Sequence, residues 1–112
     1  METFHNSEDN FRLVAEYNNE LIATITLMKD IDFNANKTVN MYSVVTAESF
    51  QGSGISHLFF NFACAWTNKL HGKRINLSTN NSDLRAQKFF TKVGCTEYSR
   101  DEDEIFYEKI IG

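Results

Sequence analysis

The sequence predicts a single small domain of the α+β (α/β layered) class, a mixed, mostly antiparallel twisted sheet that carries two main helices. The chain has 112 residues, of which 42% are hydrophobic, enough apolar material for one core. Alternating apolar and polar residues predict a hairpin toward each end of the chain. Between the hairpins, a strand, a long helix and a second strand follow one another. This order predicts a right-handed crossover that joins two parallel strands.

The first hairpin follows a polar N-terminus, in which a short edge strand is expected around Thr3–His5. Phe11–Tyr17 alternates between apolar and polar residues, and Leu21–Met28 is the returning strand after a turn at residues 18–20. Residues 29–38 are polar and rich in Asn, and we expect them to form a mobile loop.

The central strand and helix occupy residues 39–70. Val39–Thr46 is an apolar run rich in β-branched residues, as expected of a buried strand. A helical period then begins, and the residues on its predicted apolar face are Ile55, Leu58, Phe59, Phe62, Ala63, Trp66 and Leu70. We expect this helix to stop at Gly72, acting as a C-cap residue.

The C-terminal half holds a short strand, a second helix and the last hairpin. The strand is predicted over Arg74–Ser78, and residues 79–82 are of the types that start helices. The apolar side of the second helix consists of Ala86, Phe89, Phe90 and Val93. Gly94 is expected to close that helix, and the hairpin then pairs Cys95–Ser99 with Glu104–Ile111 around an acidic tip.

Composition and charge exclude several classes of function. The formal net charge of −4 disfavours nucleic acid as the main partner, because phosphate binding needs a basic surface, and it fits a cationic substrate better. No apolar run reaches about 18 residues, so no membrane span is expected, and the N-terminus lacks the features of a signal peptide. Cys64 and Cys95 lack C-x-x-C spacing, so we expect no metal site and no redox pair, and a cytoplasmic location.

Two glycines, Gly52 and Gly54, stand between the central strand and the long helix. A strand, a glycine loop and a helix bring free backbone N–H groups and the positive end of a helix to one place, which suits an anion such as a diphosphate. The glycines are also compatible with a simple strand-to-helix turn. Two familiar nucleotide-binding loops are excluded. No Lys follows Gly54, as G-x-x-x-x-G-K-[ST] requires, and His57 replaces the third glycine of G-x-G-x-x-G.

The loop does resemble a third pattern. Residues 51–56, QGSGIS, resemble the [QR]-x-x-G-x-[GA] pyrophosphate loop of the GNAT superfamily of acyl-CoA-dependent N-acetyltransferases, with the small residue Ser56 where Gly or Ala is usual. The family's second signature is L-x-V-x-x-x-N-x-x-A-x-x-F-Y-x-x-x-G-F. Its positions are taken without a gap by Leu77, Thr79, Asp83, Ala86, Phe89, Phe90, Gly94 and Cys95. The two signatures lie in the family's order, and the resemblance covers roughly residues 11–111, which implies one GNAT-like acetyltransferase domain over residues 1–112.

The resemblance implies a site for acetyl-CoA between the central strand and the Arg74–Ser78 strand. Backbone of the central strand would bond the pantetheine arm, the loop N–H groups would hold the diphosphate, and the second helix would flank the cofactor. The implied cofactor-binding residues are Val44, Val45, Thr46, Gln51, Gly52, Ser53, Gly54, Ile55, Ser56, Asp83 and Phe90. The implied reaction is direct attack of a primary amine on the thioester. The amine would be a protein lysine or N-terminus, or a polyamine-like small molecule.

Departures from the family pattern affect the catalytic residues most. Phe90 stands where the family usually has a Tyr that protonates the leaving thiolate, and Phe cannot do so. Tyr42 and Tyr98 are weak candidates for that role, and both are also explained as core or surface aromatics. Asp83 replaces the usual Asn and is also explained as a helix N-cap. The central strand carries no acidic residue before Glu48, so the general base is unassigned.

Two alternatives to an efficient enzyme therefore stay open. One is a catalytically weak or inactive CoA-binding or interaction protein that retains the fold. The other is a structural or partner-binding module in which the glycine loop is only a turn. The family usually places a strand and one or two helices before the Phe11 hairpin, and ten residues cannot supply them. We therefore expect the acceptor side to be open, or to be completed by the acceptor itself or by a second subunit in a homodimer.

Overall fold

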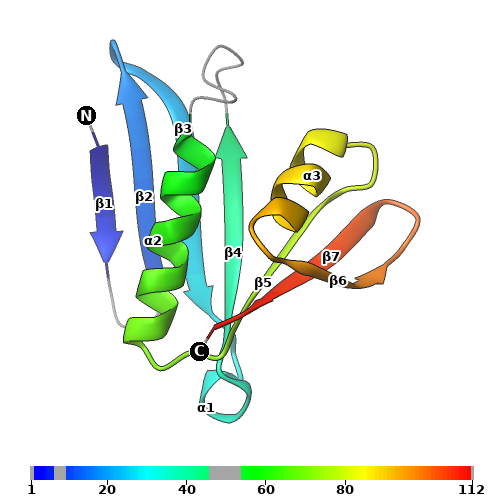
Figure 1. The fold of residues 1–112 in the computed structure, drawn as a ribbon. Coiled ribbons are helices and arrows are strands. Elements are labelled where there is room, and N and C mark those ends of the chain that lie inside the picture. Colours follow the sequence, from blue (N-terminus) through cyan, green and yellow to red (C-terminus); the bar gives the residue numbers. More distant parts are fainter. Residues whose placement is uncertain (1, 7–9, 46–53, 112) are drawn as a thin grey trace.

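A computed structural model describes the backbone of residues 2–6, 10–45 and 54–111, and the side chains of residues 10–43 and 54–111. Seven strands form one mixed sheet in the order β1-β2-β3-β4-β5-β7-β6 (Figure 1). The elements are β1 (Glu2–Asn6), β2 (Asn10–Tyr17), β3 (Glu20–Lys29), α1 (Phe33–Asn36), β4 (Thr38–Val45), α2 (Ile55–Lys69), β5 (Arg74–Asn80), α3 (Leu84–Lys92), β6 (Thr96–Arg100) and β7 (Glu104–Ile110). β4 and β5 pair in parallel and the other neighbours are antiparallel, as the predicted crossover requires.

The N-terminal strands confirm the predicted hairpin and edge strand. β1 pairs with β2, and β2 returns to β3 through Asn18 and Asn19. Both Asn residues have positive φ angles, 51° and 63°, which Asn tolerates better than most residues and which a tight hairpin turn requires. The turn residues therefore set the register that places Leu13 opposite Ile25 in the core.

The prediction of a mobile loop over residues 29–38 is wrong, because this segment contains α1. Phe33 is buried, and Lys29 and Lys37 place their ammonium groups 5.1 and 5.3 Å from its ring centroid. Asp30 accepts hydrogen bonds from the amides of Asn36, at 2.8 Å, and Asn40, at 3.1 Å, and these bonds lower the pKa of its carboxyl. The polar residues of this segment thus bond to one another around an apolar anchor.

Helix α2 buries a face that is rotated from the predicted one. Phe59, Ala63 and Trp66 are buried as expected, but Leu58 and Phe62 are 50% and 40% exposed. Phe60 and Thr67 are buried in their place. For Phe60 the reason is α3, because its ring packs edge to face on Phe89 with ring centroids 6.2 Å apart. The buried face of α2 is set by two neighbours, the sheet and a second helix. The apolar period of the sequence does not show which residues face which neighbour.

The end of α2 also corrects the sequence prediction. His71, rather than Gly72, takes the left-handed conformation, with a φ of 63°. The N–H of His71 donates to Asn68 O at 3.0 Å and that of Gly72 donates to Thr67 O at 2.8 Å, the paired bonds of a Schellman motif. Gly72 is needed for close approach instead, because a Cβ there would lie 2.6 Å from Thr67 Cγ2. At the end of α3, Gly94 has a φ of 92° and closes the helix as predicted.

Both α2 and α3 pack on the same face of the sheet. Phe90 of α3 contacts Tyr107 of β7, Trp66 of α2 contacts Phe11 of β2, and the core lies between these helices and the strands. Side chains that alternate to the other face of β3, β4 and β7 include Met28, Tyr42 and Ile110, and they are exposed. Across the described ranges, no helix combines the length and apolar character that crossing a bilayer requires.

Candidate functional site

The centre of the sheet opens between β4 and β5. The two strands pair at only three positions, of which Asn40–Asn76 is the last. Beyond it, β4 stays paired with β3 as far as Val45–Ala23, and β5 stays paired with β7 as far as Asn80–Glu104. Figure 1 shows the two strands diverging from the end that carries α1. One backbone edge of each strand therefore borders a gap in the sheet.

A cavity of about 710 Å³ occupies this gap. Its walls come from four elements: Met41 and Ser43 of β4, the start of α2, residues 77–79 of β5, and one side of α3. Residues 77–79 are consecutive, and consecutive strand side chains point to opposite faces, so the cavity runs along the unpaired edge of β5 rather than over one face. A ligand in it would meet strand edges and two helices.

The N-terminus of α2 lies at this cavity. Gly54 is the N-cap residue with a φ of 93°, which favours glycine, and its carbonyl accepts the N–H of Leu58 at 3.0 Å. Gly54 and Ser56 line the cavity, whereas Ile55 packs on the core. The first helical turn carries unpaired N–H groups and a partial positive charge, so this wall favours an anion.

The structure describes only some of the other residues of the predicted cofactor site. β4 runs past its last pair with β5, so the backbone of Val44 and Val45 borders the gap. Thr46, Gln51, Gly52 and Ser53 lie outside the described residues.

Asp83 and Phe90 line the cavity from the side of α3. Asp83 is the N-cap of α3, its Oδ1 accepting the N–H of Ala86 at 3.1 Å, which matches the alternative explanation for this residue. The Phe90 ring packs on Tyr107 with centroids 5.2 Å apart. The structure therefore brings Gly54, Ser56, Asp83 and Phe90 to one cavity.

The candidate catalytic tyrosines do not line that cavity. Tyr42 lies on the face of β4 opposite the helices and is 58% exposed. Tyr98 lies on the edge strand β6, where its ring is 6.5 Å from that of Phe106. Their proposed roles stay untested predictions.

Sequence reasoning missed the basic wall of the cavity. Arg85, Lys88 and Lys92 of α3 all line it, and His57 lines it from α2. Their spacing, i, i+3 and i+7, puts the three cations on one side of the helix, next to the apolar stripe, so the signal was present in the sequence. A chain with a net charge of −4 thus concentrates positive charge at its cavity, and an anionic ligand fits there best.

Comparisons with known proteins agree on a family. A family model described as the acetyltransferase (GNAT) family matches residues 1–95. An acetyltransferase of the GNAT family from Streptococcus pneumoniae superposes with a TM-score of 0.80 at 16% identity, over 95% of this chain and 69% of that one. The GNAT domain of S. lividans PAT gives 0.81 at 18%, over 96% and 64%. A mutant spermidine N-acetyltransferase from Vibrio cholerae gives 0.73 at 18%, over 91% and 66%. These structural likenesses show the fold, and no match is found among curated proteins.

Proposed function

The chain belongs to the acetyltransferase (GNAT) family, and we propose that it moves an acetyl group from acetyl-CoA directly to a primary amine. The acceptor would be a protein lysine or N-terminus, or a polyamine-like small molecule. One observation carries the proposal: the cavity between β4 and β5 has a glycine-capped helix N-terminus on one side and three basic side chains on another. The spermidine N-acetyltransferase among the structural neighbours supports an amine as the acceptor class.

The residues present fit an acyl-CoA. Its phosphates are anionic, and the N-terminus of α2 together with Arg85, Lys88 and Lys92 would hold them. The cavity of about 710 Å³ lies in the range of ligand sites of about 300–1,000 Å³. The open edge of β4 offers backbone groups to an extended amide chain, in the way that one strand offers them to another.

Bound acetyl-CoA supplies an acetyl group activated as a thioester. The chain's own contribution is to hold it at the gap in the sheet and to point N–H groups of β4 toward the place where negative charge develops on the carbonyl oxygen. Phe90 has no dissociable proton, so it shapes the cavity wall and packs on Tyr107 but cannot act as an acid.

Phe90 also favours a second candidate function, a CoA-binding protein with weak or no transfer activity. The first experiment is calorimetric titration of the protein with acetyl-CoA, with CoA and ATP as comparison ligands. Saturable binding of both CoA species that is stronger than binding of ATP is expected, and a folded sample that binds none of them would overturn both candidates. Release of free thiol that depends on an added amine then separates the enzyme from the inactive protein.

A further inference from the structure

We infer that the edge strand β6 joins two copies of this chain, in an antiparallel pair whose two-fold axis passes near Tyr98 and Ser99. In this arrangement Glu97 of each copy faces Arg100 of the other. The inference goes beyond the proposed function, because β7 and β5 stand between β6 and the gap that borders β4. The association therefore does not use that gap.

Strand β6 offers an unpaired backbone edge to a second copy. It is the last strand of the sheet, and among the described strands it pairs with β7 alone (Figure 1). All five of its residues are exposed. The free N–H and C=O groups of an edge strand can bond to an extended strand of another chain. Because such an interface is short, we expect a weak dimer with a dissociation constant of about 10–500 µM.

An irregularity in β6 puts its two charged residues on one face. Relative to β7, β6 contains one extra residue, Tyr98. Glu97 lies opposite Tyr107, and Arg100 lies opposite Ile105. Both of these β7 residues are buried, so Glu97 and Arg100 point to the face that the helices cover. In a strand without the extra residue, positions 97 and 100 would point to opposite faces.

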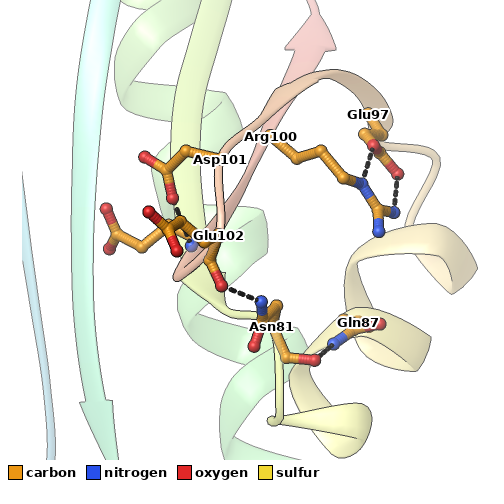
Figure 2. Close-up of polar contacts among 7 residues, drawn as sticks. Asn81, Gln87, Glu97, Arg100, Asp101 and Glu102 are labelled. Atoms are coloured by element: carbon orange, nitrogen blue, oxygen red, sulfur yellow. Dashed lines mark hydrogen bonds and ion pairs between the residues drawn. The ribbon is translucent and has the colours of Figure 1, made fainter.

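The ion pair within β6 leaves part of Arg100 open to a second carboxylate (Figure 2). Arg100 donates through Nε and Nη2 to the two carboxylate oxygens of Glu97, each at 2.7 Å, and these bonds lower the pKa of that carboxyl. A guanidinium has five N–H donors, and this contact uses one edge of it. A two-fold axis between residues 97 and 100 brings two such pairs together. The four charges then alternate in sign, so the surface is complementary to itself.

The acidic turn that follows β6 favours an antiparallel pair over a parallel one. Residues 101–104 are all acidic and all exposed. In a parallel pair the two turns would lie side by side and repel each other, whereas an antiparallel pair keeps them at opposite ends of the interface. The axis also brings together the two copies of Tyr98, which is 52% exposed and contacts Phe106.

Hydrogen bonds hold this turn in place before any partner binds (Figure 2). Asp101 Oδ1 accepts two backbone N–H groups within the turn, each at 2.8 Å. Asn81 donates through Nδ2 to Glu102 O, and Gln87 of α3 donates to Asn81 O at 3.0 Å. The turn is thus bonded to α3, and β6 continues directly into it. Association then has little additional ordering to overcome.

The test measures the oligomeric state by sedimentation velocity, from about 10 µM to about 500 µM protein. Glu97→Arg and Arg100→Glu each place like charges across the axis, and we expect each to weaken self-association more than about tenfold. An equal mixture of the two variants restores opposite charges between different chains, and a double variant with both changes restores them between identical chains. Both should associate about as well as the original protein. Glu102→Arg is the matched control, because it makes the same change of charge on the neighbouring turn.

Three results would overturn the inference: a monomer at about 500 µM, equal weakening by Glu102→Arg, or a mixture that associates no better than its components. A second measurement locates the contact. On dilution of ¹⁵N-labelled protein, NMR shifts of backbone amides should change at Thr96–Arg100 and in the adjoining β7, and changes confined to another surface would contradict the assignment. Calorimetric titration of the same variants with acetyl-CoA should show affinities within about twofold. A failure of CoA binding in every sample counts against the proposed function alone.

Discussion

His57 of α2 and Phe89 of α3 meet edge to face, with ring centroids 5.0 Å apart and ring planes at 89°. Both residues line the cavity between β4 and β5, and Phe89 also contacts Phe60 of α2. These contacts join the two helices that would hold acetyl-CoA. The relative position of the glycine-capped end of α2 and the basic side of α3 therefore depends on Phe89.

Replacing Phe89 by Ala should loosen this contact between the helices. The ring is half-buried, so we expect a loss of about 1–3 kcal/mol in the free energy of unfolding, below that of a fully buried Phe. Affinity for acetyl-CoA should fall as well, since the two walls lose their fixed spacing. Urea unfolding and calorimetry measure the two effects, and Phe89→Leu, which keeps most of the apolar volume, is the control. An unchanged affinity in a destabilised Phe89→Ala protein would show that the contact serves stability alone.

Gly54→Asp should weaken binding of acetyl-CoA by more than tenfold. The change places a carboxylate at the N-terminus of α2, where the site favours an anion. Because the φ of Gly54 is 93°, any side chain there also strains the backbone, by about 1–2 kcal/mol. Gly54→Ala carries the same strain without the charge, and no atom lies within 4 Å of its Cβ. The difference between the two variants in calorimetry isolates the charge, and equal affinities would argue against an anion at this place.

Reversing the charge on the α3 wall should reduce affinity for acetyl-CoA in a salt-dependent way. For Arg85→Glu and Lys88→Glu we expect a decrease of about threefold to tenfold each at low ionic strength, which shrinks as salt screens the interaction. Lys69→Glu, in the last turn of α2 and outside the cavity lining, is the matched control. If all three variants lose affinity alike, the effect comes from net charge and not from this wall.

Burial raises the pKa of the Cys95 thiol from its ordinary value of 9.0 to about 11, although Lys109 opposes the shift. Between these values the unfolded chain loses the thiol proton while the folded chain keeps it. The free energy of unfolding should therefore be unaffected by this group below about pH 9 and should fall as the pH rises toward 11. Urea unfolding at pH 8 and pH 10.5 measures the decrease, and Cys95→Ala should show a smaller one. Identical decreases would mean that other groups account for it.

Much of the fold was predictable because its signals are local. The alternation in β2 and β3, the apolar run of β4 and the spacing in α3 each fix an element without reference to its neighbours. The errors arose where a distant contact decided the outcome. α1 is too short for periodicity to detect and is anchored by Phe33. Phe60 is buried by α3, through Phe89, which lies 29 residues further along the chain.

The candidate site also has a part that local sequence motifs predicted and a part that depends on distant contacts. The motif resemblance pointed to Gly54, Ser56 and Phe90, and these residues do line one cavity. The contact between Ser78 and Glu104 was not predictable, because it depends on the pairing of β7 with β5. The register between strands that lie far apart in the sequence cannot be predicted from one sequence alone.

Phe90→Tyr separates an enzyme from an inactive relative most directly. The new hydroxyl would stand at the cavity wall, where it could give a proton to a leaving thiolate. We expect binding of acetyl-CoA to stay within about twofold and amine-dependent thiol release to be equal or higher. Phe106→Tyr adds the same hydroxyl to a residue outside the cavity lining and should change neither. Equal or higher turnover in Phe90→Tyr would mean that the site tolerates a hydroxyl at this position. A marked loss in a variant of unchanged unfolding free energy would instead show that the packing of Phe90 on Tyr107 positions the reacting groups.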